Sequence, residues 1–224
     1  MSDISNNIAV LQQNIQAIPH SQALLCLAVS KQQSPLRIRD AHQAGLHAFG
    51  ENYLQEALPK IDSLQDLALE WHYIGQIQGR KCKKIAQYFD WVETVDDLKL
   101  AEKLNACNQE LGKKQYILIQ VNLFDEPQKS GCSINELDNL LKAVQQLSAL
   151  NCRGLMTILP QALDKEAQLN AYRRLNQLMH HYNQALNVTM DTLSMGMSDD
   201  YPQAILAGSN IIRIGQAIFG PRSY

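Results

Sequence analysis

Short apolar runs alternate with longer amphipathic stretches along almost the whole chain, and this alternation constrains the fold more than any other feature. The apolar runs predict strands at residues 24–30, 47–50, 71–75, 91–95, 116–122, 153–158, 192–195 and 211–214. The stretches between them predict helices over residues 36–44, 53–67, 80–88, 98–111, 134–150, 165–185 and 201–207. An earlier helical pattern is carried by Ile4, Ile8, Leu11 and Ile15. Strict alternation of strands and helices is typical of a parallel sheet with its helices outside.

Eight strand–helix units favour closure of the sheet into a (β/α)8 TIM barrel, an α/β fold, here with an extra amino-terminal helix. The 224 residues fall within the ~200 to 400 typical of this fold and suit one domain over residues 1–224. An open doubly wound sheet is the alternative. However, no Gly-x-Gly-x-x-Gly motif follows the first strand, where such a sheet would bind a dinucleotide. The barrel is therefore the predicted architecture.

Composition excludes several classes of protein. The net charge of −2 gives no general attraction to nucleic acids or membrane surfaces. No apolar stretch approaches the ~18 residues of a membrane span, and the first ten residues lack the basic start and apolar core of a secretory signal. The five cysteines are scattered, which indicates reduced thiols. We expect a cytoplasmic protein that binds neither nucleic acid nor membrane, and a monomer.

Lys31 is the first candidate for chemistry. It follows the first predicted strand, separated from it only by Ser30, so its amine is expected at the mouth of a packed core. Burial there favours the neutral, nucleophilic amine, which can condense with a carbonyl to form a Schiff base. A lysine at a strand end can equally reach into solvent or form an ion pair. The choice therefore depends on the other end of the chain.

The carboxyl-terminal region predicts a phosphate site. Gly215 follows the last predicted strand and precedes a stretch, residues 216–219, that could form a short helical turn. In barrels of this class, the loops after the seventh and eighth strands and a short helix usually bind phosphate. Ser194 and Ser198, near the end of the seventh strand, could each add a hydroxyl. Alternatively, Gly215 is an ordinary turn residue and Ser198 caps a helix.

A closed barrel brings these two regions together, because its first strand neighbours its eighth. A ligand with a carbonyl and a phosphate fits such a site, and pyridoxal 5'-phosphate is the commonest cofactor of this kind. Arg213 lies two residues before Gly215 and so on the same strand face. Facing the pocket, its permanent charge would contact the pyridine nitrogen and weaken the ring as an electron sink, which disfavours transamination. Alternatively, Arg213 pairs with a carboxylate on the barrel wall.

Seven short segments, in order and at fitting spacing from about residue 24 to the end, carry a family resemblance. They are Ala28-Val29-Ser30-Lys31, Phe49-Gly50-Glu51-Asn52, Trp71-His72-Tyr73-Ile74-Gly75, Gln120-Val121-Asn122, Arg153-Gly154-Leu155-Met156-Thr157-Ile158, Leu193-Ser194-Met195-Gly196-Met197-Ser198 and Arg213-Ile214-Gly215 through Phe219-Gly220. Together they closely resemble the pyridoxal phosphate homeostasis protein family.

The resemblance implies a barrel related to the amino-terminal domain of alanine racemase, with pyridoxal 5'-phosphate (PLP, a form of vitamin B6) as its cofactor. The implied contacts are a Schiff base on Lys31, the pyridine nitrogen at Arg213, phosphate at the backbone of Gly215 and Gln216 and at the hydroxyl of Ser194 or Ser198, and Asn52 near the cofactor. Gln216 replaces the family's usual Thr or Ser, which removes a hydroxyl near the phosphate. The family is associated with PLP and amino-acid homeostasis and has no established reaction, so PLP-dependent apoenzymes are its conceivable partners.

Three functions fit these residues: a non-catalytic PLP carrier or regulator, a PLP-dependent amino-acid racemase, and a Schiff-base enzyme of the aldolase type. Racemisation needs two opposed acid–base groups. By resemblance, alanine racemase takes its second base from a tyrosine outside this domain, and Tyr224 is not an obvious substitute. An aldolase-type enzyme should show a carboxylate or second lysine near Lys31, for which Glu51 is the candidate. The carrier is therefore favoured.

Two other features have simpler interpretations. The basic residues Arg80, Lys81, Lys83 and Lys84 are interpreted as a solvated helix face rather than a nucleic-acid site. His72, in the third predicted strand, is either a base in the pocket or a core histidine. The sequence shows no carboxylate motif that would orient it, which favours the core.

Overall fold

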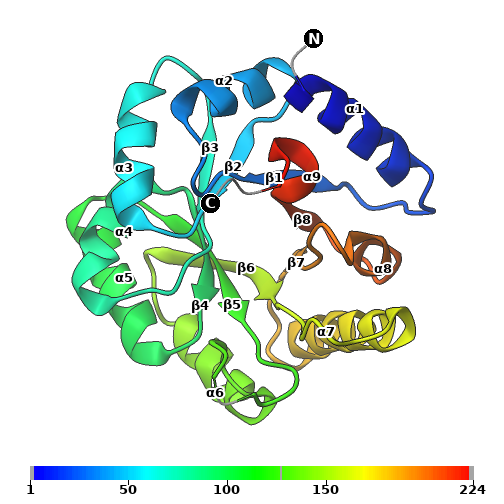
Figure 1. Cartoon of the computed structure of the whole chain (residues 1–224). Helices are drawn as coiled ribbons and strands as arrows, with labels where there is room; N and C mark the ends of the chain where they lie inside the picture. The colour runs from blue at the N-terminus through cyan, green and yellow to red at the C-terminus, as the bar shows by residue number, and fades with distance from the viewer. Residues whose placement is uncertain (1–2, 127, 222–224) are drawn as a thin grey trace.

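The barrel is closed by pairing between the first and last strands, as Figure 1 shows for a computed structural model that describes residues 3–126 and 128–221. All eight strands are parallel and each pairs with its neighbours in chain order. They are β1 Leu25–Val29, β2 Ala48–Glu51, β3 Glu70–Tyr73, β4 Trp91–Val95, β5 Gln115–Gln120, β6 Leu150–Met156, β7 Thr192–Ser194 and β8 Ile211–Ile214. The predicted (β/α)8 barrel is thus confirmed.

Helices surround the barrel, and all but the first and the last connect successive strands (Figure 1). They are α1 Asp3–Gln16, α2 Pro35–Gln43, α3 Leu54–Ser63, α4 Cys82–Tyr88, α5 Leu98–Glu110, α6 Ile134–Val144, α7 Lys165–Ala185, α8 Tyr201–Leu206 and α9 Gln216–Phe219, with a 3-10 turn, η1, at Gly79–Lys81. Several begin at capping residues that satisfy free amides of the first turn. Ser133 and Glu136, for example, form a reciprocal capping box at the start of α6.

The expected amino-terminal helix is present as α1. Its apolar face buries Ile4, Ile8 and Leu11, and it packs against α9 and α2. The side-chain amide of Asn7 donates to the carbonyl of Ile218 in α9 at 3.0 Å. The helix therefore supports α9, the element that follows the last strand.

The largest boundary difference concerns the predicted helix 134–150 and the strand after it. The helix ends at Val144 and the strand starts at Leu150, because Leu150 pairs with Gln115 of β5 and the amide of Ala149 donates to Asn105 at 2.9 Å. The apolar spacing of residues 145–150 suits a helix. The contacts with Asn105 and with Gln115 of β5 end the helix earlier and make Leu150 the start of a strand.

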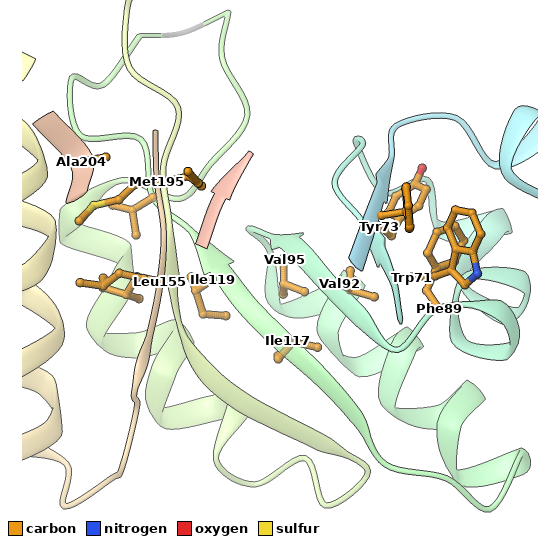
Figure 2. Close-up of a cluster of buried hydrophobic side chains, with 14 of the residues drawn as sticks. Trp71, Tyr73, Phe89, Val92, Val95, Ile117, Ile119, Leu155, Met195 and Ala204 are labelled. Atoms are coloured by element: carbon orange, nitrogen blue, oxygen red, sulfur yellow. The ribbon is translucent and has the colours of Figure 1, made fainter. Parts of the chain in front are cut away.

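Strand alternation divides the apolar residues between two regions. Outward-facing side chains pack against the helices in the main core, part of which Figure 2 shows, including Trp71, Val92, Ile117 and Leu155. Two smaller apolar groups come from the opposite strand faces, which point into the barrel. They are Leu27 with Ala48 and Ile211, and Trp91 with Leu118 and Met156. A packed barrel interior leaves room for a ligand only at its ends.

Within the described residues, none of the helices is both long and apolar enough to span a membrane. The same part of the chain contains no cluster of His, Cys, Asp and Glu suited to a metal ion. All five cysteines are free, in agreement with the sequence-based prediction of reduced thiols.

Candidate functional site

A cavity of about 300 Å³ lies at the carboxyl ends of the strands. This is the end at which barrels of this class place their functional residues. The cavity brings together six of the seven residues predicted from the sequence, namely Lys31, Asn52, Ser198, Arg213, Gly215 and Gln216. Apolar side chains, among them Val29, Ile74, Met156 and Phe219, complete its walls.

Lys31 is placed by a tight turn at the end of β1. Gln32 adopts a left-handed conformation with φ of 61°, and its amide donates to the carboxylate of Glu56 in α3 at 3.0 Å. The amide of Gln33 donates back to the carbonyl of Ser30 at 3.0 Å. A left-handed non-glycine residue is uncommon, so these contacts hold a specific turn. The turn keeps Lys31 at the cavity.

Asn52 enters the cavity directly after β2. Its side-chain oxygen Oδ1 is buried and has no hydrogen-bond partner among the described residues. Buried polar atoms in native proteins are nearly always paired, so this oxygen is suited to accept a hydrogen bond from a ligand in the cavity. The backbone of Asn52 is tightly fixed, because a Cβ atom at Gly75 would lie only 1.9 Å from its carbonyl oxygen. Only glycine allows that approach.

Arg213 projects from β8, the strand that pairs with β1. It lines the cavity although it is only 4% exposed. Its Nη1 donates to the hydroxyl of Ser194 and its Nη2 to the carbonyl of Thr157, both at 2.7 Å. Arginine has five N–H donors, so donors remain for a ligand.

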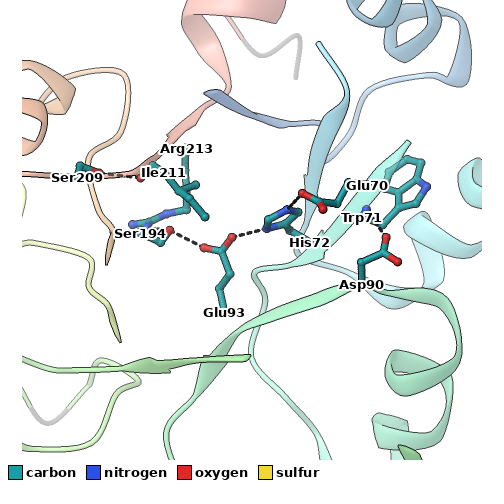
Figure 3. A network of polar contacts seen from close by, with 9 residues as sticks. All are labelled: Glu70, Trp71, His72, Asp90, Glu93, Ser194, Ser209, Ile211 and Arg213. Atoms are coloured by element: carbon teal, nitrogen blue, oxygen red, sulfur yellow. Dashed lines mark hydrogen bonds and ion pairs between the residues drawn. The ribbon is translucent and has the colours of Figure 1, made fainter. Parts of the chain in front are cut away.

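A buried chain of polar side chains continues from Ser194 across the barrel (Figure 3). The hydroxyl of Ser194 lies 2.5 Å from Oε2 of Glu93, whose Oε1 lies 2.6 Å from Nδ1 of His72. Nε2 of His72 lies 2.9 Å from Oε1 of Glu70. Ser194, Glu93 and His72 are fully buried, whereas the side chain of Glu70 is 44% exposed. We call these four residues and Arg213 the cross-barrel network.

The charges in this network support one another. Burial lowers the pKa of His72, but hydrogen bonds and charge from Glu70 and Glu93 outweigh it and raise the pKa to about 9. Burial alone would raise the pKa of Glu93, yet His72 and Arg213 hold it below its ordinary value. The hydrogen bond from His72 likewise lowers the pKa of Glu70. The raised pKa favours the cationic form of His72 between two carboxylates at neutral pH.

The structure separates the two candidate serines. Ser198 lines the cavity. Ser194 does not: it is fully buried behind Arg213, and its hydroxyl is committed to Arg213 and Glu93. Gly215 and Gln216 form the start of α9 beside the cavity. The first amides of a helix have no acceptor within it, so they can receive an anion.

Glu51, considered above as a partner for Lys31, belongs instead to a separate buried cluster. Its Oε1 accepts from the amine of Lys60 at 2.8 Å and from the hydroxyl of Ser30 at 2.7 Å. The Lys60 amine also donates to the carbonyl of Ser30 at 2.8 Å. Burial raises the pKa of Glu51 despite the nearby Lys60 charge. Neither Glu51 nor Lys60 lines the cavity, and their cluster anchors the end of β1.

Sequence reasoning missed Glu93, the buried partner of His72, and Glu70, its second partner. The available signal was a carboxylate in the middle of an otherwise apolar strand, between Val92 and Thr94. In a closed barrel, strand alternation directs such a residue inward. It also missed Gln33, Gln161 and Asp199, which line the cavity.

Comparison with known proteins agrees with this barrel. The family model for the alanine racemase N-terminal domain matches residues 1–223. An alanine racemase structure from Clostridium difficile 630 shares the fold, with a TM-score of 0.76 at 14% identity over 98% of this chain and 58% of that one. The fold class is thus the barrel of alanine racemase.

More similar proteins define the family. The chain is 45% identical to the pyridoxal phosphate homeostasis protein of Pseudomonas aeruginosa, over 100% of this chain and 98% of that protein. It is 44% identical to the protein of that name from Pasteurella multocida, over 99% and 98%. PipY of Synechococcus elongatus, solved with PLP bound, is 34% identical, with a TM-score of 0.90 over 97% of this chain and 100% of that one. The chain belongs to the pyridoxal phosphate homeostasis protein family.

Proposed function

We propose that this protein binds PLP as a Schiff base on Lys31 and takes part in intracellular PLP and amino-acid homeostasis as a carrier or regulator without catalysis. The observation that supports this most directly is that Lys31, Arg213 and Gly215 line the same cavity. These residues come from the first and last strands, which the closed barrel makes neighbours.

The residues present fit the cofactor. Lys31 offers an amine for its aldehyde, and the unpartnered Asn52 oxygen is available to a donor group in the cavity. Arg213 keeps free donors toward the cavity for the ring nitrogen. The hydroxyl of Ser198 and the amides of Gly215 and Gln216 suit the phosphate. When bound, PLP supplies an electron sink at its ring, which an always-charged guanidinium weakens.

Catalytic alternatives need residues that the cavity does not offer. Among the described residues that line it, those with ionisable side chains are Lys31, Asp199 and Arg213. A racemase needs a second acid–base group opposite the lysine, and Tyr224 lies outside the described residues. Asp199 is exposed at the cavity edge rather than opposed to Lys31 within a closed site. An aldolase-type reaction would use Glu51 or Lys60, but these two residues form an ion pair with each other and do not line the cavity.

The test is spectroscopic. Purified protein supplied with PLP should gain the absorbance band of a protonated Schiff base, and borohydride should fix the cofactor on Lys31 as a mass increase in one peptide. Lys31→Ala protein should lose both signals. Lys84→Ala, which changes an exposed lysine that does not line the cavity, is the matched control and should retain them.

Unchanged absorbance and cofactor content in Lys31→Ala protein would refute the assignment. Appearance of D-isomer from an L-amino acid, above a control without protein, would replace the carrier by the racemase. Reactivation of a PLP-dependent apoenzyme by the loaded protein, faster than by the Lys31→Ala variant with the same total PLP, would support the carrier.

A further inference from the structure

With its carboxylates ionised, the cross-barrel network has one consistent direction of hydrogen bonding, starting from Arg213. A guanidinium has donors and no acceptor, so the hydroxyl of Ser194 must accept from Arg213 at 2.7 Å. A hydroxyl has one hydrogen, and the Ser194 hydrogen is therefore donated to Oε2 of Glu93 at 2.5 Å. Glu93 accepts at this oxygen.

The same reasoning continues to the far side of the barrel. The other oxygen of Glu93 accepts from Nδ1 of His72, and Glu70 accepts from Nε2. Both ring nitrogens of His72 then carry hydrogens. Positive and negative groups alternate from Arg213 to Glu70 with one neutral hydroxyl among them. The titratable groups that face His72 are Glu70 from its own strand and Glu93 from β4, while the ring of Trp91 stacks on it at 5.4 Å.

We propose that Ser194 and Glu93 are positioning residues that hold the guanidinium of Arg213 in the cavity wall. This inference rests on the proposed function, because the group that Arg213 would contact is the pyridine ring of PLP. Ser194 and the carbonyl of Thr157 restrain the two terminal nitrogens of Arg213, one each. Glu93 orients Ser194 and supplies a buried negative charge beyond it.

The arrangement keeps the guanidinium available to a ligand. If Glu93 contacted Arg213 directly, a two-pronged ion pair would occupy two of its donors. With the Ser194 hydroxyl between them, the Glu93 carboxylate compensates the buried charge of Arg213, and Arg213 uses only one N–H donor for this contact. His72 in turn occupies the second oxygen of Glu93, so the carboxylate cannot turn toward Arg213. The network therefore fixes both the charge and the direction of Arg213.

The first experiment needs no cofactor. Nitrogen NMR of the protein alone reports the Arg213 side chain and the ring nitrogens of His72 at pH 7.5. Ser194→Ala and Glu93→Gln should both shift the Arg213 signal and speed its side-chain rotation, and Glu93→Gln should also convert His72 to a neutral ring. Asp90→Asn is the matched control. Asp90 accepts from the backbone of Trp71 at 2.9 Å and does not touch Arg213 (Figure 3), so both signals should stay.

The second experiment measures PLP affinity and the absorbance band of the bound cofactor. Ser194→Ala and Glu93→Gln should each weaken PLP binding about tenfold, the order expected for one hydrogen bond to a charged group, and shift the band. Because both act through the same contact, the double variant should lie within about twofold of either single variant. Asp90→Asn should leave affinity and band unchanged even if it lowers stability.

An Arg213 signal that neither Ser194→Ala nor Glu93→Gln changes would overturn the proposal, and so would effects on affinity that multiply in the double variant. If the unaltered protein failed to bind PLP, the proposed function would fall. The NMR comparison would still decide whether Ser194 and Glu93 position Arg213.

Discussion

The protonation of His72 predicts a specific dependence of stability on pH. In the folded protein the pKa of His72 is about 9, against an ordinary value of 6.5. A raised pKa means that the folded state holds the proton more tightly than the unfolded state. The resulting stabilisation is complete below pH 6.5 and is lost as the pH rises through 9. The gap corresponds to roughly 3 kcal/mol, at ~1.4 kcal/mol per pH unit.

The assay is urea unfolding of the unaltered protein and of His72→Gln between pH 6 and pH 10. Gln keeps a polar side chain but carries no charge between Glu70 and Glu93. Groups that do not contact His72 titrate alike in both proteins, and the charge of Arg213 still lowers the pKa of Glu93 in the variant. The difference in free energy of unfolding between the two proteins should therefore shrink by roughly 3 kcal/mol across the range.

A difference that stays constant from pH 6 to pH 10 would show that His72 does not change its charge, which would refute the reasoning. A difference that grows with pH would mean that His72 is neutral in the folded protein and that burial, rather than its carboxylate partners, sets its pKa.

Two further predictions concern packing. Gly75→Ala places a Cβ 1.9 Å from the carbonyl oxygen of Asn52 and should lower the free energy of unfolding by about 1–3 kcal/mol. In Gly215→Ala the new Cβ meets nothing nearer than 3.5 Å, so this variant should bind PLP more weakly but melt close to the unaltered protein. Equal melting temperatures of the two variants would contradict this. Lys60→Met leaves the buried Glu51 carboxylate without its ion pair and should lower the free energy of unfolding by roughly 3–5 kcal/mol in chemical unfolding. Arg39→Met removes an exposed ion pair and should cost far less. Similar losses in the two variants would argue against this prediction.

The barrel could be predicted from the sequence because each strand is a short apolar run and each connection has helical spacing. The outward residues of the strands and the apolar faces of the helices carry that signal locally. The segment around Leu147 and Leu150 was assigned wrongly in this way, because its apolar spacing continues that of the helix before it. The helix ends before this segment because Ala149 and Leu150 contact Asn105 and Gln115, which lie far away in the sequence.

The cavity could also be predicted in outline, since the carboxyl ends of parallel strands meet at one end of a barrel. That placed Lys31, Arg213 and Gly215 together. The partners of Arg213 could not be predicted, because they depend on which side chains meet across the barrel interior. Ser194 looked equivalent to Ser198 in the sequence, and only its inward direction from β7 separates them.

The pairing of β1 with β8 has a consequence for biosynthesis. A ribosome releases Lys31 early, but Arg213 and Gly215 only near the end of translation. At ~5–20 residues per second the interval is on the order of ten seconds or more. During it, the emerging polypeptide has the Lys31 amine without the neighbouring strand that carries Arg213. PLP binding therefore requires that β8 has been synthesised, and truncated translation products that lack this strand should not bind PLP.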